Sequence, residues 1–187
     1  MTQSQFMKKL ASCTHFNEGD LGNRANRLRE EGMLQKGGRG LAAVQINARE
    51  GAIVLLSAMS GSSANACPTT VKNLPEGLID AIAEILNDVS KADMIESFTY
   101  DHINNVGIIT LSDGKKEIFG KQADYNSGVV HFINGNVLRL LSLVFQDKES
   151  KKARMFWGME VARIAATKGE EAAKQWMEDH PFDAEKK

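Results

Sequence analysis

The sequence lacks the features that mark disulfide-rich, membrane-spanning or strongly charged proteins. Its 187 residues include two cysteines, Cys13 and Cys67, which are far apart and outside any C-x-x-C pair. That spacing argues against a disulfide framework and against a cysteine-based zinc site. No stretch approaches the roughly 20 apolar residues that a membrane-spanning helix needs. These absences predict a folded cytoplasmic protein that has no membrane partner.

Charge is nearly balanced over the whole chain, but it is unevenly distributed. The formal net charge is −1, which argues against a generic nucleic-acid binder. Residues 1–50 nevertheless carry eight Lys/Arg against five Asp/Glu, whereas residues 51–150 carry seven against twelve. A mildly basic N-terminal segment can face an anionic ligand while an acidic body stays free of nonspecific nucleic-acid contacts.

Apolar spacing in the first 32 residues predicts two short helices. The first is capped by Thr2 and ends near Thr14, and the second is capped by Asn17 and ends at Gly32. Each has a narrow apolar stripe, made of Phe6 and Leu10 in the first helix and of Leu21, Ala25 and Leu28 in the second. Two short helices of these proportions are typical of a helix-turn-helix, in which the second helix enters the DNA major groove.

A hairpin is predicted directly after the second helix. Met33-Leu34 is expected as a short strand, residues 35–40 as a glycine-rich turn, and residues 41–46 as the return strand. Asn47 then caps a strongly apolar segment, residues 48–59, which we expect to be a buried helix.

Residues 20–50 resemble the helix-to-wing segment of winged helix-turn-helix DNA-binding regulators, including the MarR-like type and short regulators of temperate phages. In that superfamily the recognition helix ends in a phrase similar to L-x-E-x-G-L. The matching positions here are Leu28, Glu30, Glu31, Gly32, Met33 and Leu34. The hairpin and the cap at Asn47 follow in the same order. The resemblance implies that Arg39, between Gly38 and Gly40, reaches into a minor groove and that Lys36 lies over phosphates.

The predicted DNA contacts come from the second helix and the hairpin tip. Asn bonds adenine bidentately and Arg bonds guanine in the same way, and Gly22 permits close approach of the backbone. The expected DNA-binding residues are Asn17, Asn23, Arg24, Asn26, Arg27, Lys36 and Arg39. A solvated helix surface and an ordinary hairpin loop are the alternatives for these two segments.

The rest of the chain predicts a second domain. The stretch 61–77 is rich in Gly, Ser, Pro and Thr and is expected to be a loop, so the predicted domains are 1–60, which binds DNA, and 75–187, which dimerises or acts as effector. The fold class expected is α+β, mostly α, with a small antiparallel sheet. The expected elements are a helix at 76–90 and strands starting near Ile95, Val106, Lys116 and Gly128, with Asn104-Asn105 and Asp113-Gly114 as turns between the first three strands. An apolar helix at 135–145 capped by Asn134, and charge-rich helices at 150–166 and 168–180, are expected after them.

Other chemistries fit the sequence less well. The loop at 35–40 lacks the G-K-[ST] ending of a Walker motif. Cys13 with His15, or Cys67 with His102 and His131, do not have metal-ligand spacing. No G-x-S-x-G elbow surrounds the serines at 57, 60, 62 and 63. We therefore expect no catalysis, no metal and no cofactor.

The sequence favours a dimeric transcriptional regulator that binds specific double-stranded DNA. A homodimer reads two half-sites about one helical turn apart, and the helix at 52–59 and the strands at 95–133 are its expected contacts. The alternative is a protein-interaction module, such as an inhibitor of a host system, whose acidic body at 75–149 engages a protein partner.

Overall fold

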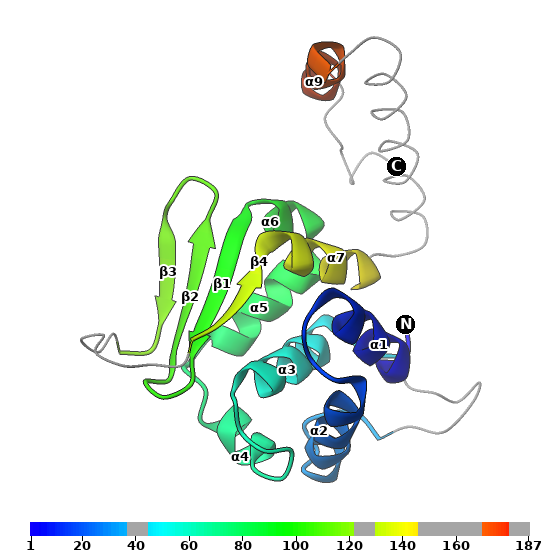
Figure 1. Cartoon of the computed structure of the whole chain (residues 1–187), viewed down its shortest axis with the longest axis vertical. Coiled ribbons are helices and arrows are strands. Elements are labelled where there is room, and N and C mark those ends of the chain that lie inside the picture. Colours follow the sequence, from blue (N-terminus) through cyan, green and yellow to red (C-terminus); the bar gives the residue numbers. More distant parts are fainter. Residues whose placement is uncertain (37–44, 122–129, 146–169, 180–187) are drawn as a thin grey trace. The chain divides into compact units, whose positions relative to one another are not determined.

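The computed structural model describes residues 1–36, 45–121, 130–145 and 170–179 (Figure 1). The chain forms two compact units, Met1–Phe145 and Gln146–Lys187. The first unit holds α1 (Gln3–Cys13), α2 (Glu18–Glu30), α3 (Ala48–Met59), α4 (Cys67–Lys72), α5 (Leu78–Asn87), α6 (Val89–Asp93), β1 (Ile95–Asp101), β2 (Val106–Leu111), β3 (Lys116–Phe119), β4 (Val130–Asn134) and α7 (Gly135–Phe145). In the second unit the structure describes α9 (Glu170–Asp179). The chain is thus α+β and mostly helical, with a small antiparallel sheet, as predicted.

Helix α3 forms the centre of the helical part. Every residue from Glu50 to Met59 is buried, and α3 packs against α2, α4 and α5. Asn47 begins the helix with a capping box, in which its side chain accepts from the Glu50 amide at 2.8 Å and the Glu50 carboxylate accepts from the Asn47 amide at 3.1 Å. The predictions of this cap and of a buried helix are confirmed.

The four strands form one antiparallel sheet in the order β3-β2-β1-β4. The β1–β2 turn contains Asn105 at a positive φ of 53°, and the β2–β3 turn contains Gly114 at 83°. Asn and Gly tolerate this left-handed conformation better than other residues do. Both turns lie where the Asn-Asn and Asp-Gly pairs predicted them.

The two faces of the sheet differ in burial. One face carries Phe98, Tyr100, Ile109 and Ile133, which are at most 4% exposed and belong to the core beneath the helices. On the other face Ile118, Ile108, Thr99 and Phe132 are in register across all four strands. Because Phe132 is 56% exposed and Ile118 44%, this row leaves an apolar stripe on the outer face.

Where the chain passes from β4 into α7, its backbone lies very close to the backbone of β1. Asn134 accepts a hydrogen bond from the Asn136 amide at 2.8 Å, so the predicted cap is confirmed. A Cβ atom at Gly135 would overlap the Ile95 carbonyl oxygen of β1. Glycine is therefore required where α7 begins, because any side chain would push the helix off the sheet.

Several element boundaries differ from the sequence prediction. The segment 61–77, predicted to be a loop between domains, contains α4 and lies within the unit Met1–Phe145, where α3 packs directly against α5. The helix predicted at 76–90 is divided into α5 and α6, because Asp88 caps a new helix with bonds from the Ser90 and Lys91 amides. The helix predicted at 150–166 lies outside the described residues. Across the described ranges, no helix is long and apolar enough to cross a membrane.

Candidate nucleic-acid interface

Helices α1 and α2 pack against each other at the N-terminal end of the unit. Thr2 begins α1 with a capping box involving Gln5, and Asn17 begins α2 by accepting from the Gly19 and Asp20 amides at 2.8 and 3.2 Å. Both caps agree with the prediction. The Asn17 side-chain oxygen, expected among the DNA contacts, is engaged in this cap.

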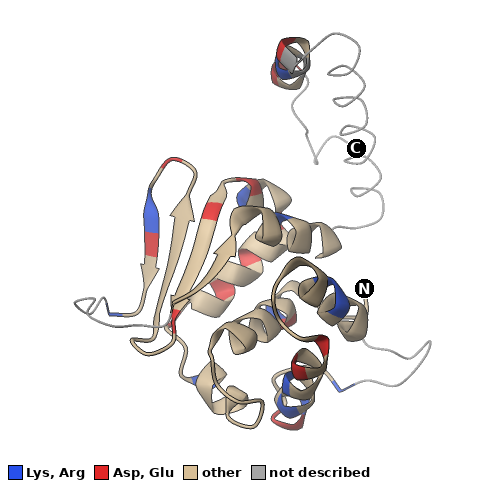
Figure 2. Ribbon diagram, in the orientation of Figure 1, with Lys and Arg blue, Asp and Glu red and all other residues tan. Residues whose placement is uncertain are grey.

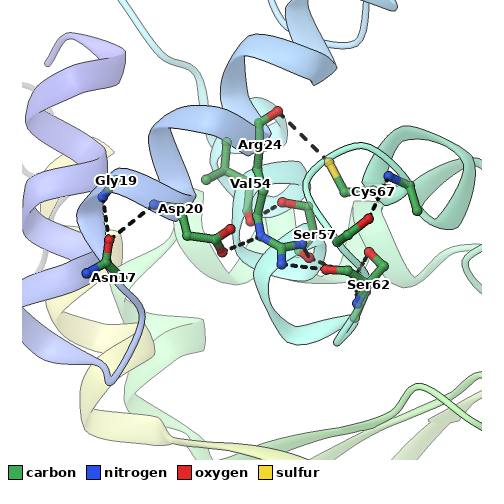
Figure 3. A network of polar contacts seen from close by, with 11 residues as sticks. Asn17, Gly19, Asp20, Arg24, Val54, Ser57, Ser62 and Cys67 are labelled. Carbon is green, nitrogen blue, oxygen red and sulfur yellow. Dashed lines mark hydrogen bonds and ion pairs between the residues drawn. The ribbon is translucent and has the colours of Figure 1, made fainter.

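The inner face of α2 is fixed by one buried arginine. Arg24 is 7% exposed, and its Nε donates to Asp20 Oδ2 at 2.6 Å. Its Nη1 donates to the Ser57 carbonyl at 2.6 Å and its Nη2 to the Ser62 carbonyl at 2.5 Å (Figure 3). The guanidinium thereby joins α2 to the end of α3 and to the loop that follows.

The exposed placement predicted for Arg24 is wrong. Position 24 follows Leu21 by three residues and precedes Leu28 by four, so the helical period brings it onto the same side as the apolar stripe. There the N–H groups of the guanidinium donate to backbone carbonyls, and these hydrogen bonds compensate for burial of its charge. Arg24 therefore positions α2 and does not lie on its outer face.

Asn23, Asn26 and Arg27 do lie on the exposed face of α2, as predicted. Together with Glu30 they line one wall of a hollow of about 460 Å³, and Ser63, Ala64 and Asn65 line the other. Arg27 donates from Nε to Asn65 Oδ1 at 2.9 Å and from Nη1 to Glu30 Oε2 at 2.8 Å. The hollow therefore presents amides, a carboxylate and a guanidinium in one place.

The loop that completes this hollow, and α4 directly after it, were not predicted to lie beside α2. Asn65 holds the Arg27 side chain although the two are 38 residues apart. Lys72 of α4 donates to Glu31 Oε2 at 2.9 Å, and this hydrogen bond and the lysine charge lower the pKa of Glu31. The sequence signal available was Pro68, which stands in the first turn of α4 and is a common helix start.

The charge around α2 is mixed in sign. Figure 2 shows acidic and basic residues together on this helix, and its carboxylates Glu18, Asp20 and Glu30 lie among three arginines. Two of these carboxylates, Asp20 and Glu30, are paired with Arg24 and Arg27. A ligand on a face of mixed charge would be held mainly by hydrogen bonds, with little contribution from long-range attraction.

The segment after α2 differs from the predicted hairpin. Met33 and Leu34 do not form a strand: Gly32, at a φ of 73°, turns the chain, and Leu34 is buried in the core with 2% exposure. The Gln35 amide donates to Glu50 Oε1 at 2.6 Å. Gln45 forms an isolated antiparallel bridge with Thr2. Lys36 is exposed, while Arg39 and the glycine-rich tip lie outside the described residues.

Comparisons with protein-family models, with curated proteins and with solved structures gave no match for this chain.

Proposed function

We propose that this chain binds double-stranded DNA through the outer face of α2. In this proposal Asn23, Asn26 and Arg27 contact base edges, and Lys36 and Arg39 contact the backbone and minor groove beside them. Binding is the whole activity, without a chemical step. The observation that carries the proposal is that three side chains suited to base recognition share one exposed face of a helix whose other face is locked in place.

The rigidity of α2 supports this proposal. A recognition helix must hold its side chains in register with the bases, so its support matters as much as its exposed residues. Here Leu21, Ala25 and Leu28 are fully buried, and Arg24 adds a polar tie to α3. Helix α1 packs against α2, as the first helix of a helix-turn-helix packs against the recognition helix.

The test is binding of the full chain to labelled random and genomic duplexes at two salt concentrations. Arg27→Ala should weaken binding to a selected site by about 1–3 kcal/mol, because a bidentate contact to guanine is lost. Arg39→Ala should weaken binding and reduce its salt dependence.

Arg49→Ala is the matched control. Arg49 lies on α3, is 58% exposed and pairs with Asp80, while Arg27 is 49% exposed and pairs with Glu30. Both substitutions remove one positive charge and one surface ion pair, but only Arg27 lies on the outer face of α2. The proposal fails if no duplex binding occurs at low salt, or if the Arg27 and Arg39 variants bind as tightly as the parent.

Action as a homodimeric regulator of transcription is part of the same proposal, and the outer face of the sheet supports it. On that face Phe132 and Val130 of the edge strand β4 are 56% and 47% exposed, and Ile118 of the opposite edge strand β3 is 44% exposed. Ile108 and Thr99 connect the two edges in one row. An exposed apolar cluster of this kind is typical of a protein contact, and a two-fold pair of sheets would bury the same residues from both copies.

Light scattering during gel filtration tests the dimer. Phe132→Lys should convert dimer to monomer, whereas Met94→Lys should not, although Met94 is also 56% exposed. A parent chain that is monomeric at every concentration would remove the homodimer and favour the alternative, in which the same face engages a different protein.

A further inference from the structure

Three of the four histidines in the sequence meet at one place in the unit Met1–Phe145. His15 lies in the connection between α1 and α2, His102 follows β1, and His131 is on β4. The ring centres of His102 and His131 are 5.7 Å apart, and those of His15 and His131 are 6.4 Å apart. A joint between the helical part and the sheet is thus built from imidazoles.

The His102 ring is half-buried and packs against the backbone at this joint. A Cβ at Gly61, just after α3, would lie 3.1–3.3 Å from three atoms of the ring, so the imidazole rests directly on the backbone. His102 Nδ1 is buried and has no hydrogen-bond partner among the described residues. A buried polar atom without a partner is costly, and a charge in such a place is costlier still.

The geometry does not suit a metal ion. The His15 and His131 rings are stacked with an interplanar angle of 10°, so their nitrogen lone pairs lie in parallel planes and do not converge on one point. No group of three His, Cys, Asp or Glu in the described part of the chain is arranged to hold a metal. The three imidazoles are therefore better placed to take up protons than to bind a metal ion.

Among the described residues, the charged groups that interact with the cluster are its own imidazoles and Asp101. Burial lowers the pKa of His131 first, and the charges of His102 and His15 lower it further. Asp101 is the carboxylate that interacts with His102. Burial raises the pKa of Asp101, but hydrogen bonds from the Asn104 side chain and amide and from the Ile103 amide outweigh it, so the net pKa is lowered. Asp101, already bonded to Asn104 and Ile103, thus interacts with one of three imidazoles that repel one another once protonated.

We propose that His15, His102 and His131 form a pH-sensitive joint, which holds the segment entering α2 against the sheet near neutral pH and loosens as the imidazoles take up protons. A histidine that resists protonation in the folded state stabilises the protein fully above its ordinary pKa of about 6.5. Below that value the histidine is protonated in the unfolded chain but still neutral in the folded chain. The free energy of unfolding therefore falls as the pH is lowered, until the pH is below the pKa of the folded state as well.

Thermal unfolding of the full chain at pH 7.5 and 5.5 tests the proposal, because carboxylates stay largely ionised over that interval. The midpoint of the parent should fall by roughly 2–4 °C more than that of His131→Gln. His15→Gln, a substitution at an exposed position, should reduce the fall in the same direction and serves if the His131 variant does not fold. His180→Gln removes the fourth histidine and should behave as the parent.

Two local measurements distinguish loosening at the histidine cluster from a general destabilisation of the protein by acid. The NMR titration of the His131 ring should have a midpoint below the ordinary histidine value, and His15→Gln should move it upward. Deuterium uptake of the segment 11–17, corrected for intrinsic rates, should rise at pH 5.5 in the parent. Equal acid shifts of the melting midpoint in parent and variants, or a His131 ring that titrates at its ordinary value, would overturn the proposal.

Discussion

Arg24 and Arg27 stand three residues apart on α2 and have opposite environments. Arg24 is buried and donates to two carbonyls and a carboxylate from three parts of the chain. Arg27 is 49% exposed and shares its donors with Asn65 and Glu30 at the rim of a hollow. The same side chain is therefore a buried structural tie on one face of the helix and a solvent-exposed group on the other.

The difference arises from helical geometry. Position 24 shares its side of the helix with Leu21 and Leu28, so the N–H donors of its guanidinium must find acceptors within the protein or remain buried and unpaired. Position 27 faces solvent, where an ion pair contributes about 0–1 kcal/mol to stability. The residue type thus predicts which hydrogen bonds a side chain can make, while its position on the helix determines whether it makes them in the core or at the surface.

The largest expected effect comes from the apolar part of the inner face. Leu28 is fully buried, so Leu28→Ala should lower the free energy of unfolding by about 2–5 kcal/mol through lost burial and a residual cavity. Urea unfolding measures it. Asn26→Ala, on the outer face, is the control and should change stability by less than about 0.5 kcal/mol. Similar losses in both variants would mean that the two faces of α2 do not differ.

Removal of the polar tie should have the next largest effect. Arg24→Ala leaves the carbonyls of Ser57 and Ser62 without this donor, and we expect a loss of about 2–3 kcal/mol. Arg24→Lys keeps the charge but cannot reproduce a planar fork that reaches three acceptors, so it should recover only part of the loss. Full recovery with lysine would show that charge alone, and not the fork geometry, fixes α2.

A gain in stability is expected at Gly22. Nothing lies within 4 Å of a Cβ built there, so Gly22→Ala should raise the free energy of unfolding by about 0.5–1 kcal/mol through helix propensity. If the helix backbone approaches DNA closely, the same variant should bind duplexes more weakly. Weaker binding in a more stable protein would separate recognition from folding, and a stability loss would contradict the open environment of this position.

The smallest expected effect on stability belongs to the exposed arginine. Arg27→Ala should change the free energy of unfolding by less than about 0.5 kcal/mol, since its ion pair is at the surface. Thermal and urea unfolding check this. A loss as large as that of Arg24→Ala would show that the bond from Arg27 to Asn65 fastens the loop, and the outer face would then be structural as well.

Local signals in the sequence predicted much of the fold. The caps Thr2, Asn17, Asn47 and Asn134 all act where expected, because a cap depends on a side chain and the next three amides. The strand turns were found for the same reason. The helical spacing of Leu21, Ala25 and Leu28 also predicts that Arg24 lies on the buried side of α2, although Arg24 was expected among the DNA contacts.

The rest depended on contacts between distant residues. The hollow needs Asn65 and Ser63 to face α2 from a loop nearly 40 residues away, and no local pattern encodes that approach. Met33 and Leu34 look like the start of a strand, yet Leu34 is drawn into the core beside α3. The proximity of His15, His102 and His131 likewise depends on tertiary packing, because the sequences around them share no motif.

The close approach at Gly135 has a consequence for recognising relatives of this chain. Exposed residues on the outer face of α2 are free to diverge, whereas a side chain at position 135 is barred by the Ile95 carbonyl in any protein with this β4–α7 connection. An invariant glycine after an asparagine cap, at the junction of a short strand and an apolar helix, should therefore persist over longer evolutionary distances than the exposed residues of α2.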